Sequence, residues 1–302
     1  PSNTAGAINS VVSHSLGQTS NIWYLDGYLA NVCFIDGQAL TPTSFGEYED
    51  TLWKPKSDAD IQALTFGTNG FYLAFEDSSA IGDDTSGNTN DWTANNLVAT
   101  DVVPDSPVTN FATFNPNIRF NSGSLSEGNL KSSSVVGGSS NYGCAGSTMT
   151  VTSGKWYCEM RMDAGTVSDI YAGAFSPRND SNIRFGKEIA ALYLNNIYSD
   201  GSAVQTGLSN PAVGDIFGFA VDVDNKTCDV TKNGSAYGSQ VDWSSHTYAD
   251  LGFQGIGHYH GASASNSTIS VNYGQDSSFA GNETPQGNTD DNGQGDFYYA
   301  PP

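Results

Sequence analysis

Short apolar runs in this chain are separated repeatedly by Asp-Gly, Asn-Gly and Asp-Asn pairs, and this spacing is the feature that most limits its fold. Such pairs favour tight turns between antiparallel strands, because they adopt the backbone angles that two-residue hairpin loops need. Examples are Asp200-Gly201, Asp224-Asn225 and Asn233-Gly234. No segment shows a convincing helical period of apolar residues. The sequence therefore predicts an all-β protein built from antiparallel strands.

The composition agrees and excludes several functional classes. Residues that favour helices (Lys, Arg, Glu, Leu and Met) are scarce, whereas 34 of the 302 residues are Gly. The chain has 11 Lys and Arg against 32 Asp and Glu, and a net charge of −21 repels the phosphates of nucleic acid. Its longest apolar runs, such as 215–223, fall well short of the ~20 residues that a membrane-spanning helix needs. We expect no nucleic-acid partner, no membrane insertion and no signal peptide.

The pattern along the chain predicts four parts. In residues 1–77 the Asp26-Gly27 pair predicts a hairpin and Pro42 a one-turn helix. Residues 78–118 are a turn-rich connector, with the domain boundary expected within 105–118, and residues 276–302 predict an extended acidic tail. Residues 119–275 form the main domain, whose many short strands are typical of an antiparallel sandwich. The strands are expected at 117–120, 148–152, 155–163, 170–176, 190–194, 215–224, 227–233, 247–253 and 267–274.

Two segments of the second half resemble the SPRY domain. The first, 153–160 (SGKWYCEM), matches a strand of that family through Gly154, Trp156, Tyr157 and Glu159. The second, 214–238, matches a later hairpin and the K-N-G that ends the following strand. The resemblance covers about 120–275 and implies a concanavalin-like β-sandwich that binds ligands through loops at one face.

The first half resembles a different pattern, common in tail-fibre proteins of marine bacteriophages. The matching segments are 24–48 (YLDGYLANVCFIDGQALTPTSFGEY), 52–56, 67–79 and 86–97. In those proteins the first segment is the closing strand of a laminin-G-like jelly roll, so residues 1–77 are expected to be part of such a domain. The resemblance also implies that the chain is an internal piece of a longer polypeptide or an unusually short relative.

Motifs for catalysis and for metal or nucleotide binding are missing from the sequence. It contains no GxSxG, GxGxxG or GxxxxGK[ST], and its four histidines have no obvious catalytic neighbours. We therefore expect no enzymatic activity. The cysteines, Cys33, Cys144, Cys158 and Cys228, contain no CxxC pair, which predicts neither a zinc site nor a disulfide framework. Two of them, Cys158 and Cys228, are expected as buried free thiols in strands.

One histidine pair could hold a metal in an oligomer. His258 and His260 stand at i and i+2, so on a strand they share one face. In a trimer with this face near its axis, six imidazoles would converge on a transition metal at the symmetry axis; the alternative is an exposed polar strand. So acidic a surface would also attract Ca²⁺, although Asp222 and Asp224 lack the full calcium-loop pattern and belong to the hairpin.

Three aromatic residues near turns are candidates for a sugar-binding platform. They are Tyr198 beside Asp200-Gly201, Trp243 and Tyr259. Flat aromatic faces near amide or carboxylate groups are typical of glycan recognition, but each residue alone could equally lie in the core of a sandwich. Trp156 is expected in the core.

These features together suggest a structural protein of a bacteriophage virion, a tail fibre or similar appendage. It would bind a glycan or protein of the host surface, contact other virion proteins and form a homo-oligomer, with a trimer favoured. The alternatives are a capsid decoration protein and, ranked lower, a glycan-degrading enzyme. The charge of −21 means that binding to an anionic cell surface would depend on aromatic contacts, hydrogen bonds or bridging cations.

Overall fold

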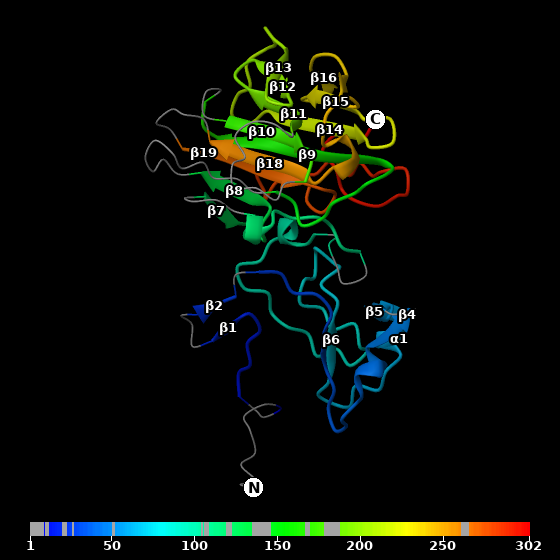
Figure 1. The fold of residues 1–302 in the computed structure, drawn as a ribbon. Helices are drawn as coiled ribbons and strands as arrows, with labels where there is room; N and C mark the ends of the chain where they lie inside the picture. Colours follow the sequence, from blue (N-terminus) through cyan, green and yellow to red (C-terminus); the bar gives the residue numbers. More distant parts are fainter. Residues whose placement is uncertain are drawn as a thin grey trace. The chain divides into compact units, whose positions relative to one another are not determined.

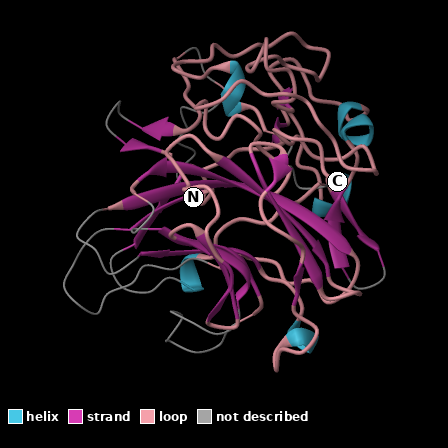
Figure 2. Ribbon diagram, turned by 90° about the horizontal axis from the view of Figure 1, so that it is seen from above, coloured by secondary structure: helices cyan, strands magenta, loops and turns pink. Residues whose placement is uncertain are grey.

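The computed structural model describes residues 9, 12–19, 23–25, 27–49, 52–103, 105, 109–118, 123–134, 146–166, 170–177, 188–260 and 266–302. The chain divides into two compact units, Pro1–Asn110 (unit 1) and Phe111–Pro302 (unit 2). Strands dominate the described parts, and helices are few and short (Figures 1 and 2). None of the helices in these ranges is long and apolar enough to cross a lipid bilayer.

Unit 2 contains two antiparallel sheets, which confirms the predicted all-β fold. One sheet has five strands, in the order β13 (Ser202–Gln205), β12 (Asn196–Ser199), β11 (Glu188–Tyr193), β10 (Ile170–Phe175) and β18 (Gly255–His260). The other has eight: β16 (Ser235–Ala236), β15 (Thr227–Lys232), β14 (Ile216–Asp222), β9 (Lys155–Ala164), β19 (Ser267–Asn272), β8 (Lys131–Ser134) and β7 (Gly123–Ser126) in that order, with β17 (Val241–Asp242) paired to β15. The turns at Asp200-Gly201 and Asn233-Gly234 connect neighbouring strands as predicted.

The core of unit 2 forms because side chains alternate along each strand. On β9, the side chains of Cys158, Met160 and Met162 point to the interior, and on β14 Phe217 and Phe219 do the same. All five are at most 1% exposed, and each side chain of this kind contributes about 1.5–3 kcal/mol when fully buried. Two helical turns, η3 (Pro116–Ile118) and η4 (Ala249–Leu251), complete the described elements of unit 2.

The thiols of Cys158 and Cys228 lie in this core and are free, as the sequence predicts. Cys33 in unit 1 is also a free thiol. Cys144 lies outside the described residues.

The chain after residue 275 packs on the outer face of the eight-stranded sheet, so the predicted extended tail is wrong. Phe279 and Phe297 are buried, and the carboxylate of Glu159 on β9 accepts hydrogen bonds from the backbone amides of Tyr298 (2.9 Å) and Tyr299 (2.7 Å). Glu159 itself is fully buried. A buried carboxylate is costly unless it is hydrogen-bonded, and the returning chain supplies two of the donors that it needs.

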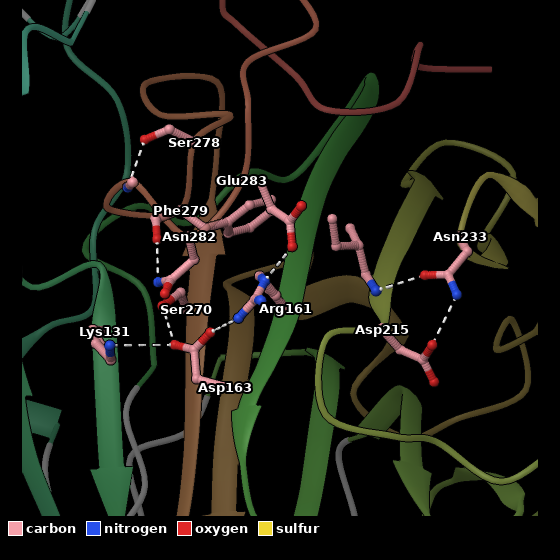
Figure 3. A network of polar contacts seen from close by, with 12 residues as sticks. Lys131, Arg161, Asp163, Asp215, Asn233, Ser270, Ser278, Phe279, Asn282 and Glu283 are labelled. Atoms are coloured by element: carbon pink, nitrogen blue, oxygen red, sulfur yellow. Dashed lines mark hydrogen bonds and ion pairs between the residues drawn. The ribbon is translucent and has the colours of Figure 1, made fainter. Parts of the chain in front are cut away.

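A second polar cluster connects the same sheet to the returning chain (Figure 3). The guanidinium of Arg161 bonds Asp163 (2.5 Å) on its own strand and Glu283 (2.8 Å). Asp163 also accepts from the hydroxyl of Ser270 on β19 and lies 3.6 Å from the ammonium of Lys131 on β8. The cluster therefore joins three neighbouring strands to the segment that follows them.

Unit 1 has a small core and three separate two-stranded sheets. The pairs are β1 (Gln18–Thr19) with β2 (Trp23–Tyr24), β3 (Val32–Phe34) with β6 (Phe71–Leu73), and β4 (Gly46–Glu49) with β5 (Leu52–Pro55). Its helical elements are η1 (Pro42–Ser44), which confirms the turn predicted at Pro42, α1 (Asp58–Gln62) and η2 (Ala99–Asp101). Ile61, Phe66, Tyr72 and Ala74 form the buried cluster.

The hairpin expected at Asp26-Gly27 falls on a residue, Asp26, that lies outside the described residues. On either side of it, β2 pairs backward with β1, and β3 pairs with the distant β6. The turn-rich connector contains few regular elements, as expected, and around residues 82–92 it is held by side-chain hydrogen bonds. Buried Asp84 accepts from the backbone amides of Tyr72 (2.8 Å), Ser86 (2.9 Å) and Asn90 (2.9 Å).

Two expectations for unit 2 need correction. Residues 148–152 and 247–253 contribute only one bridge, Val151 to Phe253, instead of two strands. Residues 116–118 form a helical turn, and 119–122 lie outside the described residues. Unit 2 begins at Phe111, within the range 105–118 in which the domain boundary is expected, and Phe114 is already fully buried in its core.

The first prediction concerns Glu159. Glu159→Ala should lower the free energy of unfolding by about 3 kcal/mol, because two part-buried backbone amides lose their acceptor. It should also expose residues 276–302 to limited proteolysis. Glu159→Gln keeps one acceptor oxygen and should lose less. The control is Asp250→Ala at an exposed position, and urea unfolding measures all three variants. Equal losses of unfolding free energy for Glu159→Ala and Asp250→Ala would contradict the role of Glu159 in holding the chain after residue 275.

The second prediction concerns pH and Asp84. Burial raises the pKa of Asp84, but its backbone hydrogen bonds outweigh this effect and hold the pKa below the ordinary value for Asp. The ionised group therefore stabilises unit 1 fully above pH ~4 and loses this effect as pH falls through the lowered pKa. Asp84→Asn should increase hydrogen exchange in 71–92 at neutral pH, and the difference from the wild type should shrink in acid. The control is Asp83→Asn at the adjacent, exposed position, which should change neither the hydrogen exchange of 71–92 nor its pH dependence. If Asp84→Asn differs from the wild type equally at all pH values, the ionised carboxylate of Asp84 does not stabilise unit 1.

Candidate ligand-binding site

A cluster of aromatic side chains lies on the outer face of the five-stranded sheet. It consists of Tyr171 and Phe175 on β10, Tyr193 on β11 and Tyr198 on β12, and we call it the tyrosine patch. The register places these residues together, because Tyr171 pairs with Tyr193 and Ala191 pairs with Tyr198. The ring centroids of the three tyrosines lie 5.6–5.9 Å apart, within the range in which aromatic rings attract one another. Tyr193 and Tyr198 are half-buried, so they present ring surface to solvent.

A buried carboxylate positions the patch from below. Glu188 is fully buried and accepts a hydrogen bond from the hydroxyl of Tyr171 (2.6 Å) and another from the backbone amide of Gly201 (2.8 Å). Burial and the charge of Glu188 raise the pKa of Tyr171, so its hydroxyl remains a donor at neutral pH. The same carboxylate thus fixes a ring of the patch and the Asp200-Gly201 turn next to Tyr198.

The three aromatic residues singled out in the sequence have different places. Tyr198 belongs to the tyrosine patch. Trp243 does not reach the surface: its side chain is fully buried in the core of unit 2, and the ammonium of Lys226 lies 5.2 Å from its ring. The expectation that Trp243 contacts a ligand is therefore wrong. Tyr259 lies opposite Tyr171 in the backbone register, but its side chain lies outside the described residues.

The predicted metal ligand His258 is a core residue. It is 1% exposed, and its two ring nitrogens lie 3.0 Å from the hydroxyls of Ser132 on β8 and Ser267 on β19. With both nitrogens engaged between the sheets, this imidazole has no lone pair facing solvent for a shared metal. The side chain of His260 lies outside the described residues. Within the part of the chain that is described, no three His, Cys, Asp or Glu side chains are grouped to hold a metal ion.

The sequence interpretation is wrong for Trp156 and right for Asp222. Trp156 is not a core residue: it is 47% exposed and donates its indole N–H to the carbonyl of Ser153 (2.7 Å). It lies at the start of β9, beyond the edge of the core. Asp222 behaves as the hairpin interpretation predicts, since its carboxylate accepts from the backbone amide (2.9 Å) and the side chain (2.8 Å) of Asn225.

An open cavity of about 400 Å³ lies beside Cys33 in unit 1. It is lined by Ala30, Asn31, Cys33, Phe45, Pro55, Lys56 and Ile61. Burial, together with the charge of Asp58, raises the pKa of Cys33 to about 11, so the thiol is protonated at neutral pH. A protonated thiol is a poor nucleophile, and the cavity therefore does not support cysteine catalysis.

The sequence interpretation missed Tyr171, Tyr193 and Glu188. A signal for two of them exists. In IYAGAF and AALYL, alanine and leucine alternate with the tyrosines, so antiparallel pairing puts both tyrosines on the face away from the core. Glu188 carries no comparable signal, because it lies at the start of β11 and its partners come from other strands and turns.

Comparison with known proteins gives similarity only to solved structures; no family model and no curated protein matches the sequence. The SPRY domain of human HERC1 is similar at 19% identity and a TM-score of 0.43, over 52% of this chain and 96% of that one. The TRIM65 PSpry domain is similar at 14% identity and a TM-score of 0.37, over 53% and 91%. A stonustoxin structure is similar at 16% identity and a TM-score of 0.38, over 67% and 33%. The β-sandwich of unit 2 is established by its own strand pairing.

The third prediction tests whether Glu188 positions the patch. Tyr171→Phe removes a donor from a buried carboxylate and should lower the free energy of unfolding by about 1–3 kcal/mol. Tyr193→Phe keeps the Tyr171–Glu188 hydrogen bond and should lower the free energy of unfolding by less. Urea unfolding measures both, and similar losses would show that this hydrogen bond does not anchor the patch.

Proposed function

We propose that this chain is a structural, non-enzymatic protein of a bacteriophage virion, a tail fibre or similar appendage that binds a glycan of the host surface. The observation that carries the binding role is the tyrosine patch, in which half-buried Tyr193 and Tyr198 pack against Tyr171, whose hydroxyl is held by the buried carboxylate of Glu188. The assignment to a virion rests on the resemblance of residues 24–97 to bacteriophage tail-fibre sequences. The proposal also gives a location: the protein would be part of the virion, which assembles in the host cytoplasm and acts outside the cell.

The chemistry of the patch suits a sugar ring. An aromatic ring offers a flat apolar face on which the C–H groups of a sugar can pack, and a tyrosine hydroxyl adds a donor and an acceptor at its edge. Tyr193 and Tyr198 supply two such rings with their centroids 5.8 Å apart. Glu188 is engaged by Tyr171 and Gly201, so its role is to position these groups.

The charge of the chain favours contact by stacking over contact by charge. With a net charge of −21, the protein is repelled by anionic surfaces at long range. A rigid aromatic patch avoids this problem because the attraction acts only at short range and loses little conformational entropy on binding. A neutral segment of a surface polysaccharide is therefore the ligand class that we favour.

The fourth prediction tests the patch directly. Tyr198→Ala should weaken binding of the purified protein to host cells at least about tenfold, because a central aromatic contact contributes about 2 kcal/mol or more. Tyr198→Phe keeps the ring and should retain most of the binding. Extracted surface polysaccharide should compete with the cells for the wild-type protein.

The matched control is Tyr48→Ala, which removes a 70% exposed tyrosine from unit 1. It should bind like the wild type. Equal binding by Tyr198→Ala and Tyr48→Ala would place the receptor site elsewhere. Release of oligosaccharides during the assay would favour a glycan-degrading enzyme.

Copy number separates the appendage from a capsid decoration protein. A tail fibre is present in few copies per virion, whereas a decoration protein follows the symmetry of the capsid. Quantitative mass spectrometry of purified virions should find a small number. A count in the hundreds would overturn the appendage proposal without affecting the binding assay.

A further inference from the structure

The open cavity beside Cys33 has a wall that is built on the core of unit 1. Ile61 belongs to the buried cluster of that unit, and Cys33 and Phe45 pack against the cluster. Ala30 and Pro55 add to the apolar part of the wall. The volume of about 400 Å³ lies within the range of small-molecule sites, which are mostly apolar and contain a few polar groups that orient the ligand.

Two hydrogen-bond donors line the same cavity. They are the ammonium of Lys56 and the side-chain amide of Asn31, and both residues are half-buried. Within the part of the chain that the structure describes, neither side chain forms an ion pair or a hydrogen bond. A half-buried ammonium has lost part of its water, so it gains most from an acceptor that carries negative charge.

The distribution of charge in unit 1 sets Lys56 apart. Unit 1 contains two Lys and no Arg against 14 Asp and Glu. The other lysine, Lys54, lies 3.9 Å from the carboxylate of Glu47, whereas Lys56 lines the cavity. The carboxylate of Asp58 is not among the described residues that line the cavity, and it accepts a hydrogen bond from the hydroxyl of Tyr72. The cavity is therefore a place in this acidic unit where an anion meets a positive charge.

The backbone fixes the position of Lys56. Its amide donates to the carbonyl of Phe45 (3.0 Å) at the base of the hairpin formed by β4 and β5. The next residue, Ser57, caps α1 by accepting a hydrogen bond from the amide of Asp60 (3.3 Å). Lys56 is thus held between a strand and a helix, which lowers the entropy that a ligand must overcome to order it.

We propose that this cavity binds a small organic carboxylate, whose charged group bonds Lys56 and Asn31 while its apolar body lies against Phe45. A carboxylate has two oxygens, so it can accept from the ammonium and from the amide at the same time. The pKa of Cys33 is raised to about 11, so its thiol adds no negative charge to the cavity at neutral pH. The proposal concerns unit 1 and does not depend on the receptor proposal, which concerns unit 2.

The test compares 2-naphthoate with its neutral analogue 2-naphthalenemethanol, each titrated into the full 302-residue chain by isothermal titration calorimetry. The naphthoate should bind with a dissociation constant on the order of 0.1 mM, and the alcohol at least about tenfold more weakly. Lys56→Met should reduce naphthoate binding to the level of the alcohol, because it removes a charge-assisted hydrogen bond. The matched control is Lys54→Met, which removes the same charge outside the cavity and should bind like the wild type.

A second measurement places the probe without any substitution. Saturating naphthoate should slow the alkylation of Cys33 by iodoacetamide in the wild type, followed by peptide mass spectrometry at about pH 9, where a small fraction of the thiol is ionised and reactive. The alcohol at the same concentration should protect Cys33 less. A wild type that does not bind naphthoate, equal affinities for the two probes, equal binding by Lys56→Met and Lys54→Met, or an unprotected Cys33 would overturn the proposal.

Discussion

The alternation of side chains on β9 is the constraint on which unit 2 depends. This strand lies between β14 and β19 in the middle of the larger sheet, and its two faces have opposite chemistry. Met160 and its neighbours of the same parity face the core, while Glu159 and Arg161 face the other way. A sheet face that carries a carboxylate and a guanidinium needs a polar cover, and the chain after residue 275 supplies it. The sandwich and the returning segment therefore form one unit.

The tyrosine patch is the candidate surface whose support is clearest in the structure. The tyrosine patch is built on strands of a large sheet and is fixed by the buried carboxylate of Glu188, so its geometry is set before any ligand arrives. Such preorganisation favours selective binding, because little entropy is lost when the ligand is bound.

Local sequence patterns predicted the elements whose information is local. The alternation in 155–163 and 215–224 and the pairs Asp224-Asn225 and Asn233-Gly234 correspond to strands and turns that the structure contains. Prediction failed where a distant partner decides the outcome. Strand β3 pairs with β6, about forty residues away, and no local pattern predicts that partner. A turn signal depends on neighbouring residues, whereas this pairing depends on the burial gained between distant segments.

The candidate site shows the same division. Composition and turn spacing determined an acidic, antiparallel all-β protein, and they identified Tyr198 as an aromatic residue beside a turn. The sequence alone could not assign Trp243 to the core, His258 to a pair of serines, or Glu188 to Tyr171, because each environment is assembled from strands that are distant along the chain. Turns and alternation are properties of neighbouring residues, whereas burial and hydrogen-bond partners are properties of the packed sheets.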